Sequence, residues 1–425
     1  MTVGESAIRR VRRRLIPFLA LLYFVAYLDR VNVGFAALQM NAALGLTPLQ
    51  YGRGAGIFFL GYFLFEVPSN VALARFGARI WIARIAIVWG LVSMATVFVA
   101  GPTSFNIMRF LLGVAEAGFF PGIVFYFTYW FPARERARAL AQFYVASMVA
   151  GIVGAPLSGL LLTLQGRAGL DGWQWLFLVE GLPAVVLGLI AIAYLDDGPG
   201  QARWLPADEK DWLIETLRQE ETDVRTHEHW LRAGMLDPGV WRLSIVFFLI
   251  VVSGYGFSFF LPQIVKRMSG GSDVAVGFLT AIPFLVAAAA MIWIASHSDR
   301  TAERRWHFAG CALTAAIGLT IGSVSGTPVI AFAALAVAAI GMYGAVPPFW
   351  SLPTAFLRGT GAAVGIGVIN SIGNLGGFVG PYVMGWAQGQ SGDFRLGLRV
   401  LAASAVCSGL LVLTTTRPTR PIIPA

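Results

Sequence analysis

Apolar runs of about 20 residues recur along the whole chain, and a helix of that length crosses the hydrocarbon core of a bilayer. Only 12% of the 425 residues are charged, about half the share expected of a soluble protein. We therefore expect an all-α integral membrane protein with twelve transmembrane helices. The predicted spans lie near residues 15–38, 53–73, 80–100, 104–129, 138–162, 174–195, 240–265, 274–296, 306–324, 328–350, 361–387 and 396–416.

Basic residues gather in alternate loops between these spans. Arginine clusters lie at 9–14, 75–79, 134–138 and 300–305, whereas the intervening loops carry few basic residues. Because loops rich in Lys and Arg stay in the cytoplasm, we expect both termini to be cytoplasmic. The same rule accounts for the net charge of +9, so the expected partner is the lipid bilayer and not a nucleic acid.

A long polar segment divides the chain into six spans plus six. The expected domains are an N-terminal six-helix bundle (1–195), a cytoplasmic linker (196–239) and a C-terminal six-helix bundle (240–425). Within the linker, Asp208, Glu209 and Asp211 precede Trp212 and further apolar positions, which predicts a short amphipathic helix with acids in its first turn.

Weak internal repetition relates the two halves. The fifth span of each half carries glycines and a proline at similar spacing, namely Gly151, Gly154, Pro156 and Gly159 in one half and Gly377, Gly380, Pro381 and Gly385 in the other. Small residues allow helices to approach closely. Duplicated halves around a site at the membrane midplane are typical of secondary carriers.

Four ionised side chains fall inside predicted spans: Asp29 and Arg30 in span 1, and Arg109 and Glu116 in span 4. Charges at membrane depth mark substrate and ion pathways, because each is costly unless it is paired or faces water. Arg109 and Glu116 are seven residues apart, on one helix face and roughly 10 Å apart along the axis. Tyr27 shares a face with Arg30, whereas Asp29 points about 100° away, toward a neighbouring helix.

Segments 27–32, 61–70, 109–122 and 173–183 resemble the anion:cation symporter branch of the major facilitator superfamily, which includes bacterial carriers for tartrate, sugar acids and phthalate. The loops after spans 2 and 8 are similar to the superfamily's G-x-x-x-D-R-x-G-R loop, with departures at Asn70, Ala74, Ala302 and Glu303. The resemblance implies two pseudo-symmetric six-helix bundles, alternating access, a monomer, and a place in the bacterial cytoplasmic (inner) membrane.

Arg30 is the first candidate for binding a substrate carboxylate, because a guanidinium matches a carboxylate with two parallel hydrogen bonds and stays charged. The resemblance implies the same role for Arg30, with Tyr27 and Tyr62 adding phenolic hydrogen bonds. The alternative is that Arg30 only neutralises Asp29 or Glu116.

Asp29 and Glu116 are the candidate proton carriers. A carboxylate in a low dielectric favours its protonated form, and a nearby arginine favours the charged form. Substrate that binds the arginine would therefore promote protonation, and the two binding events would favour each other. Arg109 is expected to pair with these carboxylates and to tune them; the alternative is a static ion pair that joins spans 1 and 4. Two further buried acids, Glu66 and Glu180, are interpreted as structural.

Spans 7–12 contain almost no central charge. Their polar residues are uncharged, and such groups can recognise hydroxyls or a ring while the first half handles charge. The resemblance implies that Trp350 and Asn370 help to bind substrate. For each residue alone, a role in helix packing remains an alternative.

These features predict a proton-coupled symporter that imports a small organic anion, such as the hydroxy-dicarboxylate tartrate or a sugar acid. It would need no cofactor, since the proton gradient drives it, and no metal site is expected. The alternative is an exporter or exchanger of organic anions or aromatic carboxylates, which the segment Gly151–Pro156 favours. No nucleophile elbow, phosphate-binding loop or clustered metal ligands indicate an enzyme.

Overall fold

The computed structural model describes residues 2–224, 237–353 and 359–415. Every regular element in these ranges is a helix, and eleven helical segments among them are long and apolar enough to cross a membrane. The prediction of an all-α membrane protein is therefore confirmed. The predicted span 361–387 is divided between two helices of 16 residues each, Gly359–Asn374 and Gly376–Ser391, which meet at Leu375 and extend beyond the predicted span at both ends.

The helices up to the polar segment are α1 (Val3–Val31), α2 (Val33–Ala43), α3 (Pro48–Phe76), α4 (Ala78–Ala95), α5 (Pro102–Glu116), α6 (Phe119–Thr128), α7 (Ala133–Leu161), α8 (Gly172–Tyr194) and α9 (Ala207–Val224). Those that follow are α11 (Pro238–Ser269), α12 (Asp273–Thr301), α13 (Arg305–Val324), α14 (Pro328–Gly344), α15 (Val346–Trp350), α17 (Gly359–Asn374), α18 (Gly376–Ser391) and α19 (Arg395–Leu413).

Several predicted spans are longer or more broken than the apolar pattern indicates. Span 1 is a helix from Val3, because Thr2 and Glu5 form a reciprocal capping box that starts it well before the apolar run. Span 4 is interrupted between α5 and α6, where Gly118 adopts a left-handed conformation with φ of 82° that only glycine adopts readily.

Contacts within the chain define two compact units. The first contains Met1–Thr226 and Leu261–Ala281, and the second contains His227–Phe260 and Ile282–Ala425. The last turns of α11 and the first turns of α12 thus group with the first half of the chain. The domain boundaries expected at 195/196 and 239/240 stay a prediction.

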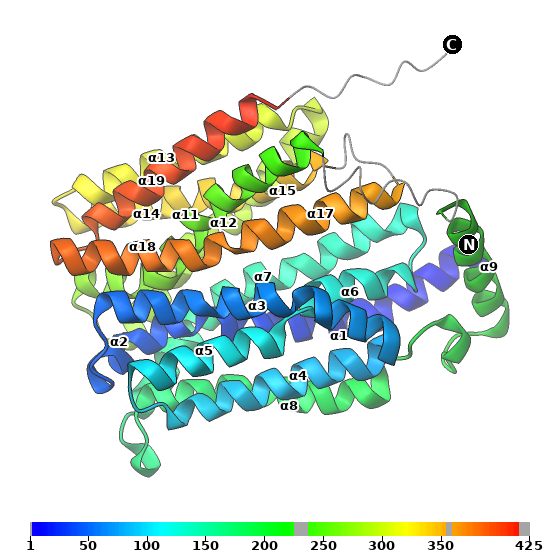
Figure 1. Cartoon of the computed structure of the whole chain (residues 1–425), viewed down its shortest axis with the longest axis horizontal. Helices are drawn as coiled ribbons and strands as arrows, with labels where there is room; N and C mark the ends of the chain where they lie inside the picture. The colour runs from blue at the N-terminus through cyan, green and yellow to red at the C-terminus, as the bar shows by residue number, and fades with distance from the viewer. Residues whose placement is uncertain (1, 225–236, 354–358, 416–425) are drawn as a thin grey trace. The chain divides into compact units, whose positions relative to one another are not determined.

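Three helix pairs make the most extensive contacts in the first unit: α4 with α8, α3 with α5, and α1 with α7. Figure 1 shows α4 and α8 running side by side. In the second unit α13 packs against both α14 and α19.

The α3–α5 pair is built on glycine. A Cβ atom added at Gly113 of α5 would collide with the carbonyl oxygen of Phe58 on α3, and one at Gly61 would collide with the carbonyl oxygen of Phe110. The two backbones are therefore in direct contact, as glycine allows between membrane helices.

The predicted amphipathic linker helix is confirmed as α9, with Asp208 and Glu209 in its first turn. Glu209 accepts hydrogen bonds from Ser6 Oγ (2.6 Å) and Arg10 Nε (2.9 Å) of α1. Further along α9, Glu220 accepts a hydrogen bond from Arg136 Nη2 of α7 at 3.0 Å. These contacts attach α9 to the ends of two transmembrane helices of its own unit.

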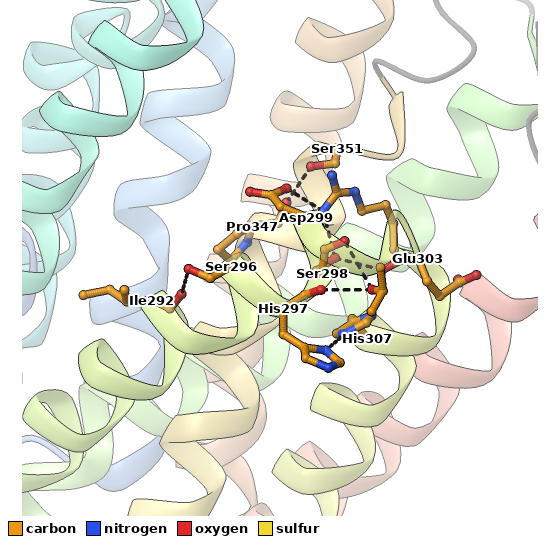
Figure 2. A network of polar contacts seen from close by, with 11 residues as sticks. Ile292, Ser296, His297, Ser298, Asp299, Glu303, His307, Pro347 and Ser351 are labelled. Atoms are coloured by element: carbon orange, nitrogen blue, oxygen red, sulfur yellow. Dashed lines mark hydrogen bonds and ion pairs between the residues drawn. The ribbon is translucent and has the colours of Figure 1, made fainter.

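The loop between α12 and α13 is the second of the two superfamily-like loops, and Figure 2 shows its polar network. Asp299 forms an ion pair with Arg304 (2.7 Å), and Ser298 Oγ donates a hydrogen bond to the carbonyl oxygen of Glu303 (2.8 Å). Ring nitrogens of His297 and His307 lie 2.7 Å apart. Residues of the loop therefore hold its conformation through contacts with one another, although the loop departs from the superfamily pattern at Glu303.

Candidate functional site

The four charged residues predicted from the sequence lie together in the first unit, at the end of α1 and along α5. Asp29, Arg109 and Glu116 are at most 1% exposed, and the Arg30 side chain is 11% exposed. Two cations and two anions thus occupy one buried region, with Arg30 the most accessible of them.

Arg30 and Glu116 form the direct ion pair of this cluster. A guanidinium nitrogen of Arg30 (Nη2) donates a hydrogen bond to Glu116 Oε1, while Glu116 Oε2 has no hydrogen-bond partner among the described residues. Arg109, which was expected to pair with the carboxylates, forms no direct ion pair with Glu116 among the described residues. This agrees with the separation of roughly 10 Å predicted for two residues seven positions apart on one helix face, and the tuning role of Arg109 stays a prediction.

Asp29 points away from Arg30 toward α4, as the helix geometry predicts. Its Oδ1 accepts hydrogen bonds from Ser93 Oγ of α4 and from Asn32 Nδ2, the latter at 3.0 Å. Both donors are fully buried. Neutral donors thus surround Asp29, and no cation of the described residues forms an ion pair with it.

Arg109 is a buried cation with little hydrogen bonding. Its Nη2 donates a long hydrogen bond of 3.5 Å to the carbonyl oxygen of Ala55, and its Nε and Nη1 have no hydrogen-bond partner in the part of the chain that the structure describes. Its guanidinium carbon lies 5.2 Å from the centre of the Phe58 ring, within the range of a cation–π contact. Its charge is therefore balanced across the cluster and not by one adjacent carboxylate.

Aromatic rings of α3 line the two guanidiniums. The Arg30 guanidinium carbon lies 5.4 Å from the Phe58 ring centre and 5.5 Å from that of Tyr62. The Tyr27 ring packs edge-on against Tyr23, with ring centres 6.2 Å apart. Tyr62 is thus beside Arg30, as a role in binding the same ligand requires, and Tyr27 lies on the same helix as Arg30.

Trp350 and Asn370 belong to the second unit. The Trp350 ring packs edge-on against Phe247 and Phe349, with ring centres 5.0 and 5.3 Å apart. Asn370 lies on α17 and is partly buried. An aromatic cluster therefore holds Trp350 in a defined position within its unit.

The sequence reasoning missed three members of the first-unit site: Ser93, Asn32 and Phe58. Phe58 is an apolar residue in an apolar span, so no sequence signal distinguishes it. Ser93 is a polar residue in an otherwise apolar run, and Asn32 lies two residues after Arg30 in segment 27–32. Their polarity at membrane depth was the signal that could have identified these two residues.

Nothing in the described ranges indicates metal chemistry, since no group of three or more His, Cys, Asp or Glu side chains there is placed to hold an ion. Charged groups buried among long apolar helices instead define a membrane transporter. The model of the Major Facilitator Superfamily matches residues 19–421. The chain therefore belongs to this superfamily, and it is a transport protein and not an enzyme.

Relatives match nearly the whole chain. It is similar to a protein of Agrobacterium vitis named "Putative tartrate transporter", with 49% identity over 410 residues that cover 96% of this chain and 94% of the relative. It is also similar to a "Quinolone resistance transporter" of Acinetobacter baumannii, with 43% identity over 404 residues that cover 95% and 93% of the two chains.

Among solved structures, a bacterial homologue of the human lysosomal transporter Spinster, in an inward-facing and occupied conformation, is similar to this chain with a TM-score of 0.75. The match covers 95% of this chain and 94% of that one at 20% sequence identity. At this identity the likeness shows the fold alone, which is that of the superfamily.

Proposed function

We propose that the protein is a proton-coupled symporter that imports a small organic anion by alternating access. The observation that supports this most directly is the Arg30–Glu116 ion pair, in which the cation is partly accessible and the carboxylate is fully buried. A carboxylate ligand can reach Arg30 and compete with Glu116 for it.

Competition for Arg30 links anion binding to proton binding. Once a substrate carboxylate binds Arg30, Glu116 loses its adjacent cation while it remains buried. An unpaired buried carboxylate is strongly destabilised, and it becomes neutral by taking up a proton. Substrate and proton would then each raise the affinity of the protein for the other, as symport requires.

Asp29 is the second proton carrier in this proposal. Its hydrogen-bond donors Ser93 and Asn32 are neutral, so protonation of Asp29 breaks no direct ion pair. The charge of Arg109 lies near enough to Asp29 and Glu116 to act on both. Arg109 then keeps the cluster electrically balanced in the empty protein.

Tartrate-like hydroxy-dicarboxylates and sugar acids are the substrates that we favour. The name of the Agrobacterium vitis relative supports this class, and so do the phenolic groups of Tyr62, whose ring lies beside Arg30, and of Tyr27 on the same helix as Arg30. We assign Trp350 and Asn370 to the hydroxyl-bearing part of the substrate. We also propose that both termini lie in the cytoplasm, which the arginine-rich loops support. The resemblance to the superfamily supports a monomer in the bacterial inner membrane.

Uptake of radiolabelled anions into proteoliposomes tests the proposal. The panel is tartrate, galactonate, glucarate, phthalate and hydroxyphenylacetate, each with and without an inward proton gradient. We expect the gradient to drive accumulation of one anion, and we expect Arg30→Ala and Glu116→Gln to abolish that accumulation. Uptake of no anion by the wild type would overturn the proposal.

The chain offers matched controls for both substitutions. Arg12 in the N-terminal half of α1 and Glu135 in the first turn of α7 form an ion pair of 2.6 Å away from the site. Arg12→Ala and Glu135→Gln therefore remove the same groups and should leave accumulation intact. If the control variants lost accumulation to the same degree as Arg30→Ala and Glu116→Gln, the substitutions at the site would be affecting folding and not transport.

Export in the same fold is the second candidate. It is favoured by the name of the Acinetobacter baumannii relative and by the glycine- and proline-containing stretch 151–156 of α7, with Pro156 inside the helix. Accumulation only under an outward proton gradient would support export, and the charged cluster would then be a structural ion-pair network.

A further inference from the structure

Lys266 is a cation that the proposed mechanism does not use. It lies in the last turn of α11, next to Arg267, and its side chain is 40% exposed. With both termini in the cytoplasm, as proposed, the end of α11 faces the periplasm, where the loops of this chain carry few basic residues. A cation on this side works against the positive-inside rule, so topology does not explain Lys266.

Asp273, the first residue of α12, contacts a different helix through each of its carboxylate oxygens. Lys266 Nζ of α11 lies 2.7 Å from Asp273 Oδ1, and Gln39 Nε2 of α2 donates a hydrogen bond of 2.8 Å to Asp273 Oδ2. Gln39 Nε2 also donates to the carbonyl oxygen of Leu162 at 3.1 Å. One carboxylate therefore joins the adjoining ends of α2, α11 and α12.

The start of α12 is also packed closely against α7. A Cβ atom at Gly159 of α7 would lie 2.6 Å from the carbonyl oxygen of Asp273, and one at Gly277 of α12 would lie 2.6 Å from that of Ala155. The segment Leu261–Ala281 belongs to the first unit, so all these contacts lie within one compact unit. Helices α2 and α7, from the first half of the chain, thus hold the start of α12, and the periplasmic side is closed at these contacts.

A carboxylate that arrives from the periplasm can compete with Asp273 for Lys266. The ammonium group of a lysine carries three donors on a flexible stem, so it can exchange one carboxylate for another. Asp273 would stay partly stabilised without this partner, because it lies at the positive end of the α12 dipole. The bound anion would lie beside Asp273 and repel it from Gln39. Anion binding and loss of the Gln39 contact would therefore favour each other.

We propose that Lys266 is an outer binding site for the carboxylate of the incoming anion, and that anion binding there releases Asp273 from Gln39 and opens the periplasmic side. This inference rests on the proposed import of an organic anion. The competing explanation is that the Lys266–Asp273 pair only holds the loop between α11 and α12, in which case anions would not change the separation of α2 and α12 through Lys266.

Distances between two spin labels test the proposal in the full-length protein in lipid vesicles. Labels on Ala43→Cys of α2 and Ala275→Cys of α12, both exposed positions, report the separation of these helix ends in a background without Cys311 and Cys407. The anions are tartrate, galactonate, glucarate, phthalate and hydroxyphenylacetate, each added in turn. We expect the anion that is transported to increase the population with the longer distance, and we expect Lys266→Gln to abolish this increase.

Two further variants make the result specific. Arg395→Gln is the matched control, because Arg395 pairs at 3.6 Å with Asp393 of its own loop, and it should keep the response to the anion. Arg30→Ala removes the proposed central site, so it should lose uptake and yet keep the response. A response that survives in Lys266→Gln, or that disappears in Arg30→Ala, would overturn the outer site and leave the symport proposal intact.

The two partners of the ion pair should also differ in anion binding. In the Arg30→Ala background, where only the outer site remains, Lys266→Gln should abolish the weak binding that saturation-transfer NMR detects. Asp273→Asn should instead strengthen it about two- to fivefold, because the anion no longer competes with a carboxylate for one partly exposed charge. A pair that only holds the loop would give the same change in both variants.

The wild type separates failure of this inference from failure of the proposed function. If the wild type accumulates an anion in the uptake assay but shows no change in the label distances with that anion, the outer site is wrong and the symport stands. If it accumulates none of the five anions, the symport is wrong and the outer site is overturned with it.

Discussion

Arg30 and Glu116 are 86 positions apart in the chain, and the guanidinium of one binds the carboxylate of the other inside the first unit. This pair joins the end of α1 to the end of α5, and it uses the most accessible cation of the cluster. A ligand that takes Arg30 away from Glu116 therefore changes the electrostatics around a fully buried carboxylate.

Arg30→Lys keeps the positive charge but loses the planar pair of donors that matches a carboxylate. A hydrogen bond to a charged group contributes about 1.5–3 kcal/mol, so we expect the apparent KM for the anion to rise by roughly tenfold or more. Initial rates of uptake over a range of anion concentrations measure this effect. Arg12→Lys is the control and should keep the wild-type KM.

Glu116→Gln mimics the protonated carboxyl group and cannot release a proton. We expect it to exchange labelled for unlabelled anion at a near-normal rate, because substrate no longer competes with a carboxylate for Arg30. Accumulation driven by the proton gradient should be lost. Counterflow measures exchange, and gradient-driven uptake in the same vesicles measures accumulation. Loss of both exchange and accumulation in Glu116→Gln would show that Glu116 is needed for binding or folding.

Gly113→Ala should destabilise the protein, because the added Cβ atom meets the Phe58 carbonyl oxygen of α3. Overpacking of a close contact costs about 1–3 kcal/mol, which lowers the melting temperature in detergent. Gly310→Ala is the matched control, since nothing lies within 4 Å of a Cβ atom at that position of α13. An equal decrease in both variants would contradict the close α3–α5 contact.

Glu209 makes the attachment of α9 sensitive to acid. Burial acts to raise the pKa of this carboxyl group, but the hydrogen bonds from Arg10 and Ser6 outweigh burial and lower its pKa below the usual 4.5. A lowered pKa in the folded state stabilises the fold above pH 4.5, and this stabilisation is lost as the pH falls through the lowered value.

Glu209→Gln should therefore reduce the melting temperature at neutral pH and have a progressively smaller effect as the pH is lowered below 4.5. Melting curves of the wild type and the variant across this range measure the difference. Glu5→Gln is the control, because Glu5 caps the start of α1 without touching α9. A difference that stays constant with pH would mean that the charge of Glu209 does not contribute.

Gln39 of α2 and Asp273 of α12 lie in the same unit, and Gln39 Nε2 donates a hydrogen bond of 2.8 Å to Asp273 Oδ2. Alternating access requires helices from the two halves of the chain to move apart at each side in turn. A short reversible crosslinker between cysteines at 39 and 273 should therefore stop uptake, and reduction should restore it.

The crosslinking experiment needs a background without the native Cys311 and Cys407. A second cysteine pair at Thr47 and Gln50 is the control, because these residues contact each other within one helix start. Uptake that continues at the wild-type rate with the 39–273 link in place would contradict movement at this contact.

Much of the first-unit site follows from the sequence. The burial of Asp29, Arg30, Arg109 and Glu116 could be predicted from their position in apolar runs, and helical periodicity gave the direction of Asp29 toward a neighbouring helix. The partner of each charge could not be predicted in this way. Periodicity relates residues of one helix, whereas the Arg30–Glu116 pair depends on how α1 and α5 are rotated and shifted against each other.

The equal number of cations and anions at the site has an electrical consequence. If all four charges are present in the empty transporter, its return step moves no net charge through the membrane, and voltage acts only on the loaded step. Each uncompensated charge is worth about 2.3 kcal/mol per 100 mV. Transport of a dianion with two protons would be insensitive to voltage, because the loaded step then moves no net charge. Transport with three protons would be favoured by a negative interior, and transport with a single proton would be opposed by it. Currents recorded during uptake would therefore count the protons that accompany each anion.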